Sequence, residues 1–294
     1  MSEFGAYIAI DWGTTNRRAY RLSAAGEVQA SIRDDRGILS LTPDDYPAGL
    51  AALREELGDL PVIAAGMVGS NRGWHEAPYA DAPADLATLA AQILAVREHR
   101  AAIVPGVALR NAGRADVMRG EEVQVLGAIA AGFAPADALF CQPGTHNKWI
   151  ATRDARVTDI ATAMTGELFA LLRGHGILSA MLDGEVADGA AFRDGLARGT
   201  GARDLTVALF EVRARVLLGR LAAADAAAFA SGLLIGADVG TRDDLAGRPV
   251  HLLAAGPLAA LYAVAIERGG GTIVPLDSEP AFVAGIHRLW EMTR

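Results

Sequence analysis

The stretch Ile8–Leu22, IAIDWGTTNRRAYRL, holds the pattern that decides the fold. An apolar run ends at Asp11, the chain turns over Gly-Thr-Thr-Asn, and an alternating run begins at Arg17. Such a pattern predicts a β-hairpin, and residues 28–33 continue it as a third strand after a tight turn. The chain therefore opens with a β-meander.

The turn of this hairpin is a candidate phosphate-binding site. Gly13 lets the backbone approach a ligand closely, and the amide groups of the turn, with the hydroxyls of Thr14 and Thr15, suit phosphate oxygens. Most Gly-Thr hairpins only reverse the chain, so one such turn is weak evidence by itself.

A second turn of the same kind follows in the other half of the chain. Gly144-Thr145-His146-Asn147-Lys148 aligns with Gly13-Thr14-Thr15-Asn16-Arg17, and each turn lies between an apolar and an alternating strand. This repetition indicates a duplication. Two such turns on opposite sides of a cleft would clamp a triphosphate, which makes Gly144, Thr145 and His146 candidate ligands of phosphate. Lys148, the only lysine among 27 basic residues, could reach phosphate or tie the two domains together.

Asp11 precedes the first turn and would repel phosphate unless a cation lay between them. A carboxylate in this place is expected for Mg²⁺ held largely through water. The alternative is that Asp11 only caps its own turn. With the duplicated turn beside it, we expect Asp11 to be a metal ligand.

The rest of the chain reads as alternating strands and helices with a boundary near residue 134. Phe133-Ala134-Pro135 breaks a helical pattern, so we expect two α/β domains, 1–134 and 135–294. The first should contain helices at 46–57, 84–96 and 119–132 and strands at 61–65 and 102–104. The second should contain strands at 138–142, 148–152, 157–160, 250–254 and 272–274, and helices at 165–173, 190–198, 205–220, 226–239, 257–266 and from 279.

A third turn, at Gly256, joins a strand to a helix. This arrangement offers a ligand the free amide groups of the helix N-terminus, although most such turns serve packing alone. We expect Gly256 to belong to an adenosine-binding segment. The turn does not fit G-x-G-x-x-G or the P-loop pattern, which counts against a Rossmann dinucleotide site and against a P-loop.

Composition excludes several classes of protein. The chain has 294 residues, is 51% hydrophobic and carries a net charge of −8, with no basic block longer than Arg17-Arg18, so we expect no nucleic-acid partner and no membrane partner. The single cysteine, Cys141, and an N-terminus without an apolar leader predict a cytoplasmic protein. The histidines form no i, i+4 pair, so a zinc site is not supported.

Several motifs extend these observations to a known family. The segments IAIDWGTTNRRAY, AAGMVGSNRGWHEAPY, VMRGEEVQVLGA, PGTHNKWI, MTGELFALL and FASGLLIGADV occur in this order over nearly the whole chain. Together they resemble the 2-dehydro-3-deoxygalactonokinase family, within the superfamily of sugar kinases, hexokinase, actin and heat-shock chaperone ATPases. The resemblance implies a two-domain actin-like ATPase fold, a ribonuclease H-like duplicated βββαβαβα, with a cleft between the domains. It also implies ATP-dependent phosphorylation of 2-dehydro-3-deoxy-D-galactonate at O6, with ATP and Mg²⁺.

The same resemblance directs attention to a catalytic base. Related kinases use a carboxylate near the start of the helix that precedes the second phosphate turn, and here that helix begins with Arg119-Gly120-Glu121-Glu122. Adjacent residues diverge by about 100° on a helix, so only one of Glu121 and Glu122 can face the cleft. We expect Glu121 to be the base, with Glu122 and Asp11 as alternatives. Acidic residues in the first turn also suit the helix dipole without any catalysis.

The loop after the strand at 61–65 is the candidate sugar-binding segment, because open α/β sheets bind ligands at the carboxyl ends of their strands. We assign Ser70, Asn71 and Trp74 to the sugar, and Arg119 to the carboxylate of a sugar acid. An exposed Asn-Arg-Gly turn is more often only a turn.

Two alternatives remain open at this level. Another acid-sugar or polyol kinase of the same superfamily would share the phosphate turns, and so would a non-enzymatic actin-like ATPase module. The sequence also leaves open whether the chain forms a homodimer.

Overall fold

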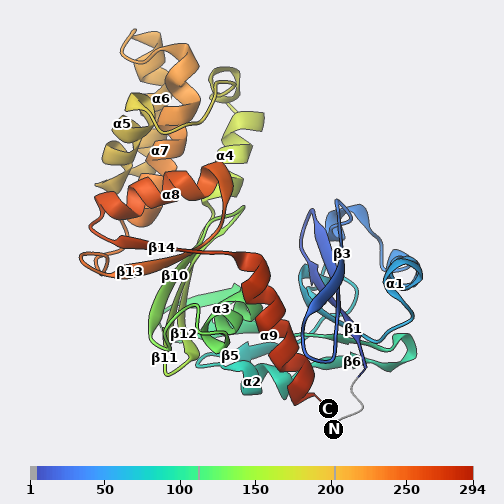
Figure 1. Cartoon of the computed structure of the whole chain (residues 1–294). Helices are drawn as coiled ribbons and strands as arrows, with labels where there is room; N and C mark the ends of the chain where they lie inside the picture. The colour runs from blue at the N-terminus through green and yellow to red at the C-terminus, as the bar shows by residue number, and fades with distance from the viewer. Residues whose placement is uncertain (1–4, 112, 202, 294) are drawn as a thin grey trace. The chain divides into compact units, whose positions relative to one another are not determined.

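The structure is a computed structural model that describes residues 5–111, 113–201 and 203–293. The chain forms two compact units (Figure 1). Unit 1 consists of Met1–Asp137, Ile150–Ile160 and Ser278–Arg294, and unit 2 consists of Ala138–Trp149 and Ala161–Asp277. The first division, at Asp137, lies close to the expected boundary at 134. Unit 2 differs from the expected domain 135–294, because two later segments belong to unit 1.

Unit 1 is built on a six-stranded mixed sheet with the order β3-β2-β1-β4-β7-β6. The opening meander is antiparallel, whereas β1 pairs with β4, and β4 with β7, in parallel. The carboxyl ends of the three parallel strands therefore meet at one edge of the sheet. The strands are β1 (Tyr7–Trp12), β2 (Arg17–Leu22), β3 (Val28–Asp34), β4 (Val62–Gly66), β6 (Leu94–Val96) and β7 (Ala101–Ile103).

Helix α1 (Asp45–Leu57) covers one face of this sheet through its buried residues Tyr46, Leu50 and Leu53. Tyr46 lies between two indoles, with ring centroids 5.1 Å from Trp12 and 5.9 Å from Trp74. These aromatic contacts join α1 to the end of β1 and to the loop after β4, so the two candidate ligand-binding segments of unit 1 share one core.

The predicted helix at 84–96 is wrong. The structure has a short helix α2 (Leu86–Ala90) followed by strand β6. Asp85 caps the N-terminus of α2, because its side chain accepts a hydrogen bond from the amide of Thr88 at 2.8 Å. β6 pairs antiparallel with β7, and this pairing outweighs the helical periodicity of the segment. A three-stranded sheet of β5 (Tyr79–Asp81), β8 (Gly106–Arg110) and β9 (Ala115–Met118) was not expected either.

The last helix, α9 (Ser278–Met292), packs on α3 (Glu121–Ala130) within unit 1. The two helices meet through glycines: a Cβ at Gly127 would collide with the backbone of Ala281, and a Cβ at Gly285 with that of Val123. Only glycine permits so close an approach, which explains why the end of the chain belongs to the first unit.

Unit 2 contains most of a five-stranded sheet with the order β12-β11-β10-β13-β14 and the helices α4 to α8. Its strands are β10 (Ala138–Gln142), β11 (Asn147–Arg153), β12 (Arg156–Ala163), β13 (Pro249–Leu253) and β14 (Thr272–Leu276), of which β11 and β12 continue into unit 1. Its helices are α4 (Thr165–Gly174), α5 (Ala190–Thr200), α6 (Leu205–Leu217), α7 (Ala226–Val239) and α8 (Gly256–Arg268). Short 3₁₀ turns occur at Ile38–Ser40, Met67–Gly69, Arg97–His99, Ser179–Met181 and Ala223–Asp225.

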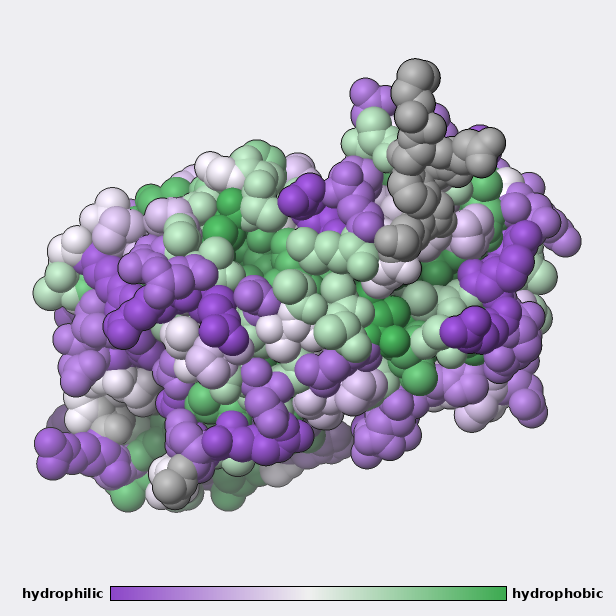
Figure 2. All heavy atoms as spheres, turned by 90° about the horizontal axis from the view of Figure 1, so that it is seen from below, coloured by the Kyte–Doolittle hydropathy of each residue, from purple (hydrophilic) through white to green (hydrophobic). Residues whose placement is uncertain are grey.

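The two sheets share one plan. Each begins with three consecutive strands in meander order, and its first strand is also the neighbour of a later parallel strand, β4 for β1 and β13 for β10. This agrees with the duplication inferred from the two turns. On the molecular face drawn in Figure 2, hydrophobic side chains reach the surface in areas interrupted by hydrophilic residues.

Candidate functional site

The first turn is held rigidly while its side chains remain exposed. The amide of Gly13 donates to the carbonyl of Asn16 at 2.9 Å, and the segment at 37–39 donates three backbone hydrogen bonds to residues 13–15. A Cβ at Gly37 would collide with the backbone of Thr15. Thr14 and Thr15 are exposed, and the hydroxyl of Thr15 accepts a hydrogen bond from the side-chain amide of Asn16 at 3.0 Å, so a fixed backbone presents two hydroxyls at the surface.

The second turn is supported in the same way within unit 2. The carbonyl of Thr145 accepts a hydrogen bond from the amide of Glu167 at 2.8 Å, at the start of α4, and a Cβ at Gly166 would collide with the carbonyl of Gly144. His146 lies 2.5 Å from the carboxylate of Glu167 through its Nε2. Each unit therefore presses a glycine against its Gly-Thr turn, which fixes the backbone that a phosphate would contact.

Asp11 lies near the end of β1, opposite Ala65 of β4 in the sheet register. Burial raises its pKa from 3.8 to about 6; the guanidinium of Arg18, at 4.0 Å, lowers the pKa and the carboxylate of Glu121 raises it. The side chain keeps 19% of its surface exposed. A carboxylate that is poorly compensated and still accessible is suited to a bound cation.

Glu121 and Glu122 point in different directions, as expected of neighbours on a helix. Glu122 is fully buried, and both of its oxygens accept the amide of Gly120, at 2.7 and 2.8 Å. Burial raises its pKa from 4.5 to about 8, and the adjacent carboxylate of Glu121 adds to the rise. Glu121 is partly exposed and accepts the amide of Arg119 at 3.0 Å. Of the two, only Glu121 has surface that a substrate could reach.

The start of α3 lies against the end of β4. Gly120 has a φ of 110°, and a Cβ there would stand 3.1 Å from the Cα of Gly66, which itself pairs with Trp12 of β1. The ends of β1 and β4 and the start of α3 thus converge at one place in unit 1. This convergence places the carboxylate of Glu121 close enough to raise the pKa of Asp11.

The loop after β4 is tied down by its own contacts. Ser70 is buried and donates its hydroxyl to the carbonyl of Met67 at 2.7 Å, whereas Asn71 is exposed. Trp74 is partly buried and stacks on Tyr46. Asn71 is therefore the member of the predicted sugar-binding set most open to a ligand.

Arg119 lies beneath this loop rather than on the surface. Its guanidinium stacks over the ring of Tyr79 at 4.2 Å and donates to the carbonyl of Ala77 at 2.8 Å. Only 7% of the residue is exposed, and among the described residues its Nε and Nη1 have no hydrogen-bond partner. The sequence could not indicate this burial, because Tyr79 belongs to a sheet that it did not predict and Ala77 lies in the loop just before that strand.

Lys148 and Gly256 both lie in unit 2. Lys148 is buried and donates to the hydroxyl of Thr162 at 2.9 Å. Gly256 is exposed at the N-terminus of α8 with a φ of 79°, a conformation that favours glycine. Pro257 follows it in the first turn, where a missing amide costs no hydrogen bond.

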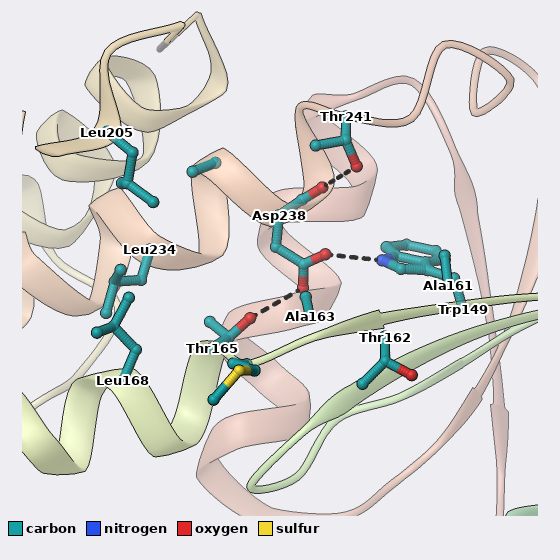
Figure 3. Close-up of a pocket in the computed structure, with 12 residues that line it drawn as sticks. Trp149, Ala161, Thr162, Ala163, Thr165, Leu168, Leu205, Leu234, Asp238 and Thr241 are labelled. Carbon is teal, nitrogen blue, oxygen red and sulfur yellow. Dashed lines mark hydrogen bonds between the residues drawn. The ribbon is translucent and has the colours of Figure 1, made fainter. Parts of the chain in front are cut away.

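Sequence reasoning missed a buried carboxylate in unit 2. Asp238 of α7 accepts hydrogen bonds from Tyr262 at 2.7 Å, Asn147 at 2.8 Å, Trp149 at 3.0 Å and Thr165 at 3.3 Å. Figure 3 shows those from Trp149 and Thr165. Burial raises its pKa, and the four donors lower it. A single carboxylate thus ties α7 to β11, α4 and α8. The signal in the sequence was an aspartate within the otherwise apolar helix 226–239.

A cavity of about 370 Å³ adjoins Asp238 (Figure 3). Leu168, Leu205 and Leu234 line one side of it, and Trp149 and Thr162 line another. The lining is largely hydrophobic, with the carboxylate as its charged member. It lies wholly within unit 2.

Neither a cluster of metal-ligating side chains nor a membrane-spanning helix occurs in the part of the chain that the structure describes. Among residues 5–111, 113–201 and 203–293, no cluster of three or more His, Cys, Asp and Glu side chains could hold a metal ion. Within the same ranges, no helix combines the length and hydrophobicity needed to span a bilayer.

Comparison with solved structures defines the class of fold. The chain superposes on the activator of 2-hydroxyisocaproyl-CoA dehydratase from Clostridium difficile with a TM-score of 0.52 and on component A of (R)-2-hydroxyglutaryl-CoA dehydratase from Acidaminococcus fermentans with a TM-score of 0.53. Sequence identities are 12% and 14%, and the alignments cover 98% and 99% of this chain and 95% and 100% of theirs. The protein therefore has the α/β fold of the actin-like ATPases.

Closer relatives define the family within that class. The family model for 2-keto-3-deoxy-galactonokinase matches residues 11–289. The 2-dehydro-3-deoxygalactonokinase of Escherichia coli is 39% identical over 289 residues, covering 96% of this chain and 97% of its own. A crystal structure from Sinorhizobium meliloti, described as a candidate enzyme of this kind, is 38% identical, with a TM-score of 0.86 over 96% of this chain and 97% of its own. The chain belongs to the 2-keto-3-deoxy-galactonokinase family, which confirms the resemblance. It is a kinase of carbohydrate metabolism, and membership supports the use of ATP.

Proposed function

We propose that this chain transfers the γ-phosphoryl group of ATP to O6 of 2-dehydro-3-deoxy-D-galactonate, yielding the 6-phosphate and ADP. The observation that carries the proposal is the similarity to a kinase named for this substrate over 96% of the chain. A cytoplasmic location, supported by the free buried thiol of Cys141, and a homodimeric state form part of the proposal.

Phosphoryl transfer depends on positioning and on stabilising the charge of the phosphates. We assign phosphate binding to the two turns, with Gly13, Thr14 and Thr15 in one unit and Gly144, Thr145 and His146 in the other. Support comes from the glycine that presses on each turn and from the exposure of the threonines. A fixed backbone loses little freedom when the anion binds, because its amides are already in place.

Two further residues of unit 2 complete the nucleotide site in this proposal. Lys148 stabilises phosphate charge or the turn that binds it, and its bond to Thr162 supports the second of these roles. Gly256 contributes to an adenosine-binding segment, since its exposed position at the start of α8 leaves room for a ligand next to the helix amides.

Asp11 fits a magnesium site. Mg²⁺ prefers carboxylate oxygens and retains several waters, and Asp11 offers an accessible carboxylate whose ionised form is only partly compensated, by Arg18 at 4.0 Å. When bound, the ion would neutralise charge on the nucleotide phosphates. Asp11 supplies the negative charge that holds it beside the first turn.

Glu121 is the proposed base for the sugar hydroxyl. It is partly exposed, its backbone begins α3, and its carboxylate is fixed by the amide of Arg119. Glu122 is less suited because no part of it is exposed. Asp11 remains the alternative base, although its proposed role as metal ligand competes with proton transfer.

We assign the sugar acid to the loop at 70–74, with Ser70, Asn71 and Trp74 as its contacts. Arg119 is the proposed source of positive charge for the substrate carboxylate. This assignment is supported by Nε and Nη1 of Arg119, which have no hydrogen-bond acceptor among the described residues. Because Arg119 is buried, a direct contact with the substrate requires the loop above it to move.

The test is an ADP-release assay with a panel of 2-keto-3-deoxy sugar acids, neutral sugars and polyols. We expect turnover with 2-dehydro-3-deoxy-D-galactonate and little with neutral sugars. Turnover of neutral sugars or polyols alone would refute the sugar-acid assignment, and ATP hydrolysis independent of any sugar would favour a non-enzymatic ATPase module.

The base is tested separately with Glu121→Gln. Loss of a general base lowers turnover by about 10²- to 10⁴-fold, while the KM for ATP should remain nearly constant. Glu55→Gln, the same change at an exposed site on α1, serves as control. Wild-type turnover in Glu121→Gln would move the base to another residue and leave the substrate assignment intact.

A further inference from the structure

Helix α6 (Leu205–Leu217) carries a hydrophobic face that the described part of the chain leaves exposed. Val207 is 56% exposed, Phe210 58%, Leu217 64% and Leu218, directly after the helix, 72%. At about 100° per residue, these four positions fall within an arc of about 100° on one side of the helix. They form a stripe along one side of α6, with the partly exposed Ala214 between Phe210 and Leu217.

The stripe does not result from a loosely attached helix. The opposite side of α6 is buried through Ala208 and Val212, which belong to a core cluster that includes Phe229 of α7. Glu211 accepts hydrogen bonds from Arg198 of α5, at 2.7 Å for the closest. α6 lies beside α7 in Figure 1, held by packing and by charge, with its outer face turned away from the unit.

The size of the stripe is unusual for one helix. From their exposed fractions, the four side chains leave on the order of 400 Å² of apolar surface, comparable to the largest patch of a typical whole monomer. A stable complex buries about 800 Å² per partner, so the stripe would supply roughly half of such an interface.

We propose that α6 is the dimerisation surface of this chain and packs antiparallel on α6 of a second copy. A twofold axis at the level of Val212 brings Val207 opposite Leu217 and Phe210 opposite Ala214. The hydrophobic stripe is therefore complementary to itself in this direction, as an isologous interface requires.

Charge favours the same orientation. Asp204, 48% exposed, stands at the start of α6 and pairs with Arg198 of its own chain at 3.0 Å, and Arg220, exposed, follows the end of the helix. The antiparallel arrangement brings Asp204 of one copy to Arg220 of the other, twice by symmetry. A parallel arrangement would bring the two Arg220 side chains together and cost interaction energy, whereas the antiparallel one places each Arg220 beside the Arg198–Asp204 pair of the other copy, so charge favours the antiparallel dimer.

The first experiment measures mass by sedimentation velocity from low to high micromolar protein. We expect the wild-type chain to form a dimer, and Phe210→Asp to weaken it by at least 100-fold. Val28→Asp, at a hydrophobic residue 48% exposed on β3, should leave the dimer intact. Circular dichroism and thermal unfolding establish that each variant is folded, and Leu218→Asp replaces Phe210→Asp should the latter not fold.

The second experiment tests the orientation by disulfide cross-linking. The only native thiol, Cys141, is fully buried and does not interfere. Val207→Cys and Leu217→Cys should each fail to cross-link alone, because ten residues of helix separate like positions by about 15 Å. An equal mixture of the two variants should form the disulfide dimer.

A wild-type chain that stays monomeric at every concentration overturns the proposal. A dimer that survives Phe210→Asp with an unchanged dissociation constant, or cross-linking of either single variant by itself, overturns it as well. None of these results depends on catalytic activity, so the proposed kinase function is tested independently.

Discussion

Replacement of the buried Glu122 by glutamine should remove a pH dependence from the stability of the fold. The folded-state pKa of Glu122 is raised from 4.5 to about 8 by burial. Between these values the folded protein binds more protons than the unfolded chain, so the free energy of unfolding falls as pH rises. The stabilisation is complete below about pH 4.5 and lost above about pH 8. At about 1.4 kcal/mol per pKa unit, the loss amounts to roughly 4–5 kcal/mol.

Glutamine keeps the shape of the side chain and an acceptor for the Gly120 amide, but it does not titrate. We therefore expect the free energy of unfolding of Glu122→Gln to rise by about 4 kcal/mol relative to that of the wild type as the pH goes from 5 to 9. Urea denaturation followed by circular dichroism at pH 5, 7 and 9 measures this difference. Glu55→Gln, at an exposed position, should follow the wild-type curve. Parallel curves for Glu122→Gln and wild type would refute the reasoning.

Three further outcomes are expected. The pKa of Asp11 is about 6 and its proposed role as metal ligand needs the ionised form, so we expect kcat/KM to fall about tenfold per pH unit below pH 6; a flat profile from pH 5 to pH 8 would contradict this. Asp238→Asn replaces an acceptor oxygen with an NH₂ group that faces buried hydrogen-bond donors, so its free energy of unfolding, measured by denaturation, should fall by about 3 kcal/mol. Asp243→Asn, the same change at an exposed residue, should lower it little. Gly285→Ala should lower stability by at least about 2 kcal/mol because its Cβ collides with α3. Gly174→Ala, with open space around its Cβ, is the matched control, and equal melting temperatures would count against the glycine contact.

Local patterns in the sequence were sufficient for much of the fold. The hairpin at Gly13 and its repeat at Gly144 were predictable because strand alternation and turn chemistry act over neighbouring residues. The helix 226–239 was predicted with its observed ends, since its largely apolar run is long and contains no proline. These elements place both turns correctly within their units.

The failures arise from contacts between distant residues. β6 was predicted as helix because its pairing with β7 is not visible in its own periodicity. The Asp238 network could not be foreseen, because its four donors come from segments up to 91 residues away. Likewise, Arg119 was assigned to the substrate carboxylate only because arginine suits an anion. The tertiary structure shows that its guanidinium is stacked on Tyr79 beneath a loop.

The position of α9 has a consequence for biosynthesis. α9 completes unit 1 by packing on α3, yet the ribosome makes it only after all of unit 2. At about 5–20 residues per second, the roughly 140 residues between Asp137 and Ser278 take on the order of 10–30 s to translate. Until α9 has been made, the face of α3 around Gly127 lacks its packing partner, and we expect the nascent N-terminal half to engage chaperones during that interval.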